Sequence, residues 1–291
     1  MSERRAGQVT AWVAAAVLAA ACGGSPGAMP RGARTGGAVA PASMAKMAPL
    51  GLELAVLVAR GDVSLRRDGA AVVLDGTTGL VEGAAGAHVL VVAATHPDGG
   101  RALVEVPLTA SGVRVGSPEP VLGLTAAGSA RVTFDGVRLH PQAVLSKSAF
   151  EKAVAFSHLT IAAVGVGVAQ AAFEAALRYA QQRSAFGKPI SQHQAIQLKL
   201  ADMATGVSAA RLLVADAGDD PVRAAVAKLQ ATATALSVTL ESMRTHGGYG
   251  YTAEFPVERY YRDAARLLHM PIPEDEARAA AAAGLRASDL D

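Results

Sequence analysis

The stretch RSAFGKPISQHQ, residues 183–194, separates two long segments whose apolar residues recur with the period of an α-helix. Gly187 and Pro189 are residue types that end helices, so the stretch predicts a helix end, a turn and a new helix start. Ser191 is the predicted N-cap of the second helix. The corner gathers a guanidinium, an aromatic ring and a side-chain amide, which together can hold an anionic ligand with a flat ring system. Spacing alone leaves open an ordinary turn with a solvated arginine and a core phenylalanine.

Upstream of this corner, the helical period begins at Ser148 and continues with one broad apolar face. Gly165 and Gly167 interrupt that face. A glycine inside a helix costs about 1 kcal/mol relative to alanine, so close approach of a second helix is the expected reason for both. Downstream, helices are predicted over residues 192–215, 221–245 and 257–269, with an alanine-rich tail helix starting at residue 274. Helices of this length predict an antiparallel bundle.

Residues 50–140 have the pattern of β-structure, with short segments rich in valine and leucine between Gly, Asp and Pro turns. Strands are predicted at residues 52–59, 70–74, 87–94, 101–106 and 130–137. Regular turn spacing favours a small barrel or sandwich. The predicted fold class is therefore α+β, a small β domain followed by an antiparallel helical bundle. We expect an N-terminal remnant and linker at 1–45, the β domain at 46–146 and the helical domain at 147–291.

Composition excludes several classes of protein. The chain has 291 residues, 51% of them hydrophobic and 18% charged, which excludes a disordered chain. A net charge of +2 argues against nucleic acid or an anionic membrane as the main partner. The single cysteine, Cys22, excludes an intrachain disulfide and a cysteine-based metal site, and no metal is expected. Residues 4–22 have the pattern of a lipoprotein export signal, but an alanine-rich helix explains them equally well, so a cytoplasmic protein is expected.

Two runs identify a family. QQRSAFGKPISQHQAIQLKLADM, residues 181–203, and HGGYGYT, residues 246–252, with EFPVERYYRDA after it, resemble the C-terminal helical domain of the acyl-CoA dehydrogenases. The resemblance extends from about residue 75 to 268. It implies an FAD-dependent oxidoreductase that removes an α-proton and a β-hydride from an acyl-CoA, with the flavin carrying the redox chemistry. It also implies an N-terminal helical domain, of which residues 1–45 can hold only a remnant.

The resemblance assigns a set of residues to the FAD of a neighbouring subunit. A guanidinium suits a diphosphate, and glycines let the backbone approach the cofactor closely. At one of these positions the family usually has glutamine and this chain has arginine, a cation that still suits an anionic ligand. The implied contacts are Arg183, Phe186, Gln194, Arg244, Gly247 and Gly248.

The catalytic base of the family has no counterpart at either expected position. The chemistry needs a desolvated carboxylate, whereas the two positions that carry it in the family fall near Pro271 and Ser157 here. Glu274 is the remaining candidate base, although a solvated helix start explains it better; His158 is no better placed than Glu274. The β domain also departs from the family at residues 52–56 and 78–82, where the flavin-side hydrogen-bond donors are absent.

The sequence retains the residues of one half of the family's cofactor site and lacks those of the other half. This combination predicts a partner subunit that completes the site. The leading hypothesis is the base-lacking subunit of an α2β2 acyl-CoA dehydrogenase, resembling actinobacterial enzymes of steroid degradation, which completes the FAD site of a homologous subunit. Two alternatives stay open. One is a stand-alone dehydrogenase or oxidase with a relocated base, acting on a CoA- or carrier-bound acyl group. The other is a cofactor-free scaffold or binding module.

Overall fold

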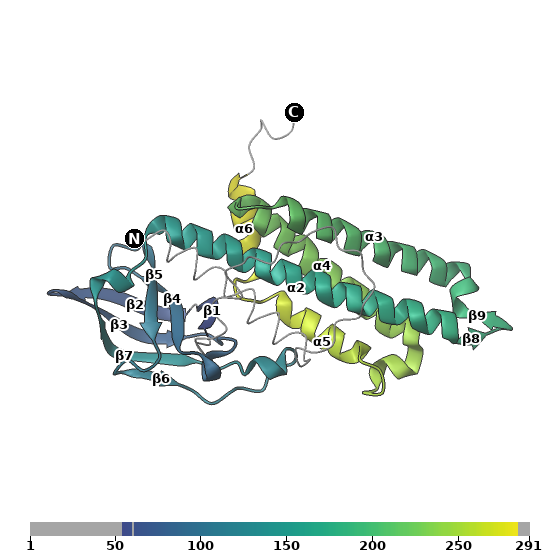
Figure 1. Cartoon of the computed structure of the whole chain (residues 1–291), viewed down its shortest axis with the longest axis horizontal. Helices are drawn as coiled ribbons and strands as arrows, with labels where there is room; N and C mark the ends of the chain where they lie inside the picture. Colours follow the sequence, from purple (N-terminus) through teal and green to yellow (C-terminus); the bar gives the residue numbers. More distant parts are fainter. Residues whose placement is uncertain (1–53, 60, 285–291) are drawn as a thin grey trace, which may run out of the picture. The chain divides into compact units, whose positions relative to one another are not determined.

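The computed structural model describes residues 54–59 and 61–284, and the export-type segment around Cys22 lies outside them. The described chain forms two compact units (Figure 1). The first contains the residues up to Val121 together with Thr125–Ala153, and the second contains Leu122–Leu124 and the residues from Val154 onward. The predicted α+β class is confirmed, because the first unit is built on a curled sheet and the second is helical.

The first unit is one seven-stranded sheet with the order β1-β4-β2-β3-β7-β6 and with β5 paired to β4. Alternation along the strands buries one face, including Leu65, Leu74 and Phe134. The strands are β1 (Leu54–Ala59), β2 (Gly61–Asp68), β3 (Ala71–Thr78), β4 (Val89–Thr95), β5 (Arg101–Pro107), β6 (Val113–Val115) and β7 (Val132–Leu139).

Sequence patterns missed two of these strands, β2 and β6. The sequence of β2 is GDVSLRRD, and only Val63 and Leu65 in it are buried. Its charged residues and its glycine are depleted in strands, so the pattern favoured a loop. The strand forms because β3 supplies an antiparallel partner along its whole length, from Gly61 opposite Thr78 to Asp68 opposite Ala71. Pairing with a neighbour therefore overrides local propensity in β2.

The second unit is a bundle of long helices, and its core is made largely of alanine (Figure 1). Small side chains let helices approach closely, so Ser242 Oγ donates a hydrogen bond of 2.8 Å to the backbone oxygen of Ala172 on the facing helix. Asp220 caps one helix by accepting from the backbone nitrogens of Val222 and Arg223. The helices are α2 (Lys147–Gln182), α3 (Gln194–Asp216), α4 (Pro221–His246), α5 (Val257–Leu267) and α6 (Glu274–Gly284).

The corner at residues 183–194 differs from its prediction. After α2 ends, β8 (Ser184–Ala185) and β9 (Lys188–Pro189) pair as a short hairpin. The backbone nitrogen of Ile190 donates to the oxygen of Arg183 at 2.8 Å and closes this hairpin, and a 3-10 turn over Ile190–Gln192 follows. The next helix therefore begins only at Gln194 with His193 as N-cap, and the predicted cap at Ser191 is wrong.

Arg262 and Asp263, in the second run that identified the family, have a structural role. The Arg262 guanidinium donates to the backbone oxygen of Leu122 at 3.0 Å and to both oxygens of Glu258. The Asp263 carboxylate accepts from the backbone nitrogen of Leu124 at 2.6 Å. The two side chains thus hold residues 122–124 against α5.

One helix in the described part of the chain, α2, is long and apolar enough to cross a membrane by length and composition alone. An 18-residue window within Phe150–Gln182 has a mean hydropathy of 1.5, and 56% of that window is buried inside the protein. A helix in the core of a bundle is covered by other helices on several sides and is therefore apolar on those sides. Such a helix passes the same test of length and composition. Ala169, Ala172 and Ala176 of α2 are buried in one core cluster with residues of α3, α4 and α5.

The two glycines within α2 offer a matched test of helix packing. A Cβ at Gly165 would lie 3.1 Å from the backbone oxygen of Ala231 on α4, whereas a Cβ at the exposed Gly167 would meet nothing within 4 Å. We expect Gly165→Ala to lower the free energy of unfolding by about 1–2 kcal/mol, because crowding outweighs the gain in helix propensity. Gly167→Ala should raise it by up to about 1 kcal/mol. Urea denaturation of both variants measures the difference, and equal effects would contradict the close approach at Gly165.

Candidate functional site

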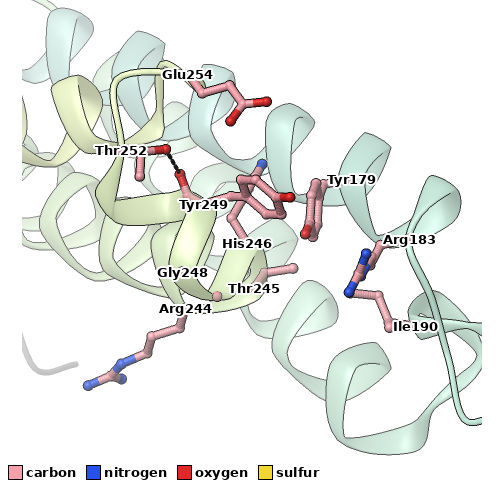
Figure 2. Close-up of a pocket in the computed structure, with 11 residues that line it drawn as sticks. Tyr179, Arg183, Ile190, Arg244, Thr245, His246, Gly248, Tyr249, Thr252 and Glu254 are labelled. Atoms are coloured by element: carbon pink, nitrogen blue, oxygen red, sulfur yellow. Dashed lines mark hydrogen bonds between the residues drawn. The ribbon is translucent and has the colours of Figure 1, made fainter.

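A pocket of about 560 Å³ opens at the end of the bundle where α2 and α4 finish (Figure 2). One wall comes from Tyr179 and Arg183 at the end of α2, with Ile190 beside them. The opposite wall is formed by residues 244–249, and residues 252 and 254 complete it. The volume lies in the range of small-molecule sites. Two segments that are more than 50 residues apart in sequence therefore form one concavity.

The floor of the pocket is the turn that ends α4. Gly247 has φ 61 and ψ −134, a backbone conformation that favours glycine, and it stops the helix. A Cβ at Gly247 or Gly248 would meet nothing within 4 Å, so both backbones are open to the pocket. A Cβ at Gly250, by contrast, would lie 2.3 Å from the backbone oxygen of Met243. Gly250 thus packs the turn onto the helix, and the other two glycines leave space for a ligand.

Two arginines give the pocket its charge. Arg183 is exposed, and its guanidinium makes no ion pair or side-chain hydrogen bond with the residues that the structure describes. Arg244 pairs with the carboxylate of Glu241, which also accepts a hydrogen bond of 2.8 Å from Lys199 on α3. Figure 2 shows the side chain of Arg244 directed away from Arg183. The pocket therefore has one free guanidinium and a second one held by an internal acid.

An aromatic cluster supports the wall between these arginines. Tyr179 and His246 are stacked with ring centroids 4.3 Å apart, and Phe255 packs its edge against Tyr179 at 5.6 Å. The Nδ1 of His246 donates to the backbone oxygen of Ser242 at 2.8 Å, so its Nε2 is the acceptor nitrogen. Burial lowers the pKa of His246, although the hydrogen bond to Ser242 opposes this shift. The imidazole is therefore a neutral, fixed part of the wall near pH 7.

The structure brings four of the six predicted contact residues to this pocket: Arg183, Arg244, Gly247 and Gly248. The other two do not line it. Phe186 is 97% exposed at the tip of the β8–β9 hairpin, and Gln194 is exposed at the first position of α3. The exposure of Phe186 excludes the alternative of a core phenylalanine. Tyr179 and His246 were missed as pocket residues, because their stacking depends on a contact between two helices that no local pattern records.

None of the candidate base positions provides a desolvated carboxylate. Glu274 lies in the first turn of α6, where its side chain is 26% exposed and pairs with Arg278 at 2.8 Å. Ser157 is buried on α2, and Pro271 precedes a short proline-bounded segment that leads to α6. Glu254 lines the pocket but is exposed. Among the described residues, the pocket is therefore lined by an unpaired guanidinium and an exposed acid, and it contains no buried carboxylate that could act as a base.

His158, which follows Ser157 on α2, is a buried histidine. Its side chain is 1% exposed, and its Nε2 has no hydrogen-bond partner among the described residues. Burial lowers the pKa of His158 to about 4, and the charge of Lys228 adds to the shift while Glu276 opposes it. Lys228 is itself fully buried, and its ammonium donates to the backbone oxygen of Ile272. His158 is therefore a neutral core residue of the bundle near pH 7.

A family model and two curated relatives indicate the same protein family. Residues 148–269 match the family model described as acyl-CoA dehydrogenase, C-terminal domain. The chain is 38% identical over 216 residues to the short-chain specific acyl-CoA dehydrogenase of Bos taurus, covering 68% of this chain and 52% of that protein. It is 36% identical over 200 residues to an acyl-CoA dehydrogenase of Bacillus subtilis, covering 64% and 53%.

A solved structure agrees with these relatives in fold. Butyryl-CoA dehydrogenase from Megasphaera elsdenii superposes with a TM-score of 0.70 at 27% identity, covering 77% of this chain and 63% of that one. The chain spans about half the length of the curated relatives it matches. The matched regions include both the sheet and the helical bundle. The chain belongs to the acyl-CoA dehydrogenase family.

Proposed function

We propose that this chain is one subunit of an FAD-dependent acyl-CoA dehydrogenase, in which its pocket completes the FAD site of a homologous partner subunit. The observation that carries the proposal is the open pocket that joins the free guanidinium of Arg183 to the bare backbone of Gly247 and Gly248. A planar guanidinium binds a diphosphate in bidentate geometry, and glycines let a ligand approach the backbone closely. FAD, when bound, supplies the hydride acceptor for the desaturation of the acyl chain.

The residues present fit the diphosphate and adenosine part of such a cofactor. Gly247 and Gly248 leave room that side chains would otherwise fill, and Arg183 provides a planar fork for two phosphate oxygens. Tyr179 and His246 form a rigid, neutral wall beside this fork. The role of the chain in this site is to bind and orient the cofactor.

Phe186 supports a site that is shared between chains. It adopts φ 52, a conformation that costs a residue with a side chain about 1–2 kcal/mol, and it exposes 97% of its surface. Among the residues that the structure describes, the aromatic ring that its ring contacts is that of His193, with centroids 6.1 Å apart. A large ring presented on a strained turn has little to stabilise it within its own chain. Contact with a partner chain would bury this ring.

The proposal assigns the catalytic carboxylate to the partner. The two positions where the family carries its base fall near Pro271 and Ser157 here, and neither of these side chains can take a proton from carbon. We extend the proposal to an α2β2 assembly in the cytoplasm and to an acyl-CoA thioester with a steroid-derived acyl chain. These finer assignments rest on the resemblance to two-subunit dehydrogenases.

Co-expression tests the proposed function. The chain is produced with a homologous acyl-CoA dehydrogenase subunit that retains its carboxylate, and the purified material is examined by mass and by flavin absorbance. We expect the two chains to purify together with FAD, whereas this chain produced alone should be colourless. Purification of this chain alone as a flavin-carrying monomer or homo-oligomer would contradict the proposal. So would a complete absence of flavin and partner in the co-expressed material.

A further inference from the structure

We propose that Glu241 and Lys199 are positioning residues that control whether Arg244 serves the pocket. In the state that the structure shows, Glu241 holds Arg244 outward, and a bound diphosphate would take Arg244 over while Lys199 keeps Glu241 neutralised. This inference rests on the proposed function, because it concerns how the same pocket binds an anionic cofactor. It makes Arg244 a second cation of the pocket, beside Arg183, that can exchange between Glu241 and the ligand.

The geometry of the three side chains carries the first step. Glu241 lies one turn before Arg244 on α4, and the two are joined by a short ion pair. Lys199 reaches the other carboxylate oxygen of Glu241 from α3 at 2.8 Å. Burial by itself would raise the pKa of Glu241, but the hydrogen bonds from Lys199 and Arg244 outweigh it and hold the pKa below its usual value. Glu241 is thus ionised and shared by two cations.

The second step compares the two partners that Arg244 could have. The side chain of Arg244 is 58% exposed, and an exposed ion pair within one helix is weak, so it can be broken at little cost. A guanidinium bound to a diphosphate makes charge-assisted hydrogen bonds in bidentate geometry, which are stronger. Arg244 lines the pocket next to Gly247 and Gly248, so only its side chain has to reorient. A diphosphate in the pocket therefore outcompetes Glu241 for Arg244.

The third step explains why Lys199 matters. When Arg244 leaves, Glu241 would remain as a half-buried carboxylate, with its side chain 22% exposed, beside an incoming anion. An unpaired acid at that position would repel the ligand. Lys199 comes from a different helix and lies outside the pocket lining, so it can stay on Glu241 in both states. The Lys199–Glu241 ion pair thereby neutralises the carboxylate that would otherwise repel the ligand when Arg244 leaves Glu241.

Titration of the purified chain with ADP and with inorganic pyrophosphate, followed by calorimetry, tests the inference without a partner subunit or flavin. Glu241→Gln removes the competing acceptor and should tighten binding of both probes by about 3- to 10-fold. Lys199→Met leaves Arg244 as the remaining cation on Glu241, so releasing Arg244 becomes more costly. The substitution should therefore weaken binding of both probes by a similar factor. Both effects should fall to within about twofold when Arg244→Gln is already present, because they act through Arg244.

Matched variants separate this mechanism from a change in overall charge. Asp216→Asn and Arg223→Gln remove the members of another exposed pair, joined at 3.3 Å near the opposite end of α4, and change the net charge by the same amounts. They should alter the affinity for ADP by less than about twofold. Circular dichroism melting confirms that each variant is folded.

Three results would overturn the inference. One is wild-type chain that binds neither ADP nor pyrophosphate at millimolar concentration. Another is an effect of Glu241→Gln or Lys199→Met that persists in the Arg244→Gln background, because both side chains would then act as distant charges only. The third is an unchanged affinity in Glu241→Gln. A failure of co-purification with FAD, by contrast, would remove the proposed function and leave this measurement of diphosphate binding intact.

Discussion

Replacing Arg183 with alanine is expected to lower the affinity of the two-subunit complex for FAD by about 10- to 100-fold. The guanidinium lines the pocket and makes no ion pair with residues 54–59 or 61–284, so the variant loses charge-assisted hydrogen bonds to the cofactor without breaking an ion pair in this part of the chain. Hydrogen bonds to charged groups are worth about 1.5–3 kcal/mol, and each 1.4 kcal/mol corresponds to a tenfold change in affinity. Equilibrium dialysis of FAD against the purified complex measures the loss.

Two further variants separate loss of the contact from other effects. Lys188→Ala removes an exposed cation from the same hairpin, outside the pocket lining, and should leave FAD affinity nearly unchanged. Arg183→Lys keeps the charge but loses the planar fork, and should fall between the wild type and alanine. If Arg183→Ala forms the complex and retains FAD with wild-type affinity, the pocket does not contact the cofactor.

Acidification is expected to destabilise the helical domain through His158. Its pKa is about 4 in the folded protein, against about 6.5 in an unfolded chain, mainly because burial penalises the charged ring and also because Lys228 is close. Between these two values the unfolded state binds more protons than the folded state, so stability is lost as the pH falls from about 6.5 toward 4. The shift corresponds to roughly 3 kcal/mol of unfolding free energy lost at pH 4 relative to pH 7.5.

Urea denaturation at a series of pH values measures this contribution as a difference between proteins. His158→Gln should flatten the profile between pH 4 and 6.5 by about the same 3 kcal/mol, while the part due to His246 remains. His140→Gln, which changes an exposed histidine, is the matched control. Identical pH profiles for the wild type and His158→Gln would show that the buried imidazole does not contribute to the acid sensitivity.

Local patterns predicted the helical part of the fold well. Helices predicted at 192–215, 221–245 and 257–269 correspond to α3, α4 and α5 within one or two residues at each end. The strong signals were the apolar period and end residues such as Asp220 with Pro221, which act within one turn of helix. The errors occur where a segment takes its conformation from hydrogen bonds to another strand, which the signals within one helical turn do not record. The polar strand β2 forms because β3 pairs with it, and the predicted cap at Ser191 fails because Ile190 closes the hairpin instead.

The two glycines of α2 also show the difference between what the sequence predicts and what helix packing decides. Both carry the same signal in the sequence, a glycine inside an apolar helix, and close packing was expected for both. Gly165 faces the backbone of Ala231 on α4, whereas the position of Gly167 is exposed and meets nothing. Only the neighbouring helix distinguishes them. A sequence pattern records what a residue is, and the packing of the bundle determines what it touches.

The sequence by itself determined the family and the α+β class, and it predicted which residues are offered to an anionic ligand, because these depend on residue types in runs of fixed spacing. Tertiary structure decided that Arg183 and Gly247–Gly248 share one pocket, that Phe186 and Gln194 lie outside it, and that Glu241 pairs with both Arg244 and Lys199. The physical reason is that these relations join the ends of different helices. Their distances are set by how alanine-lined helices pack, which is a property of the whole bundle.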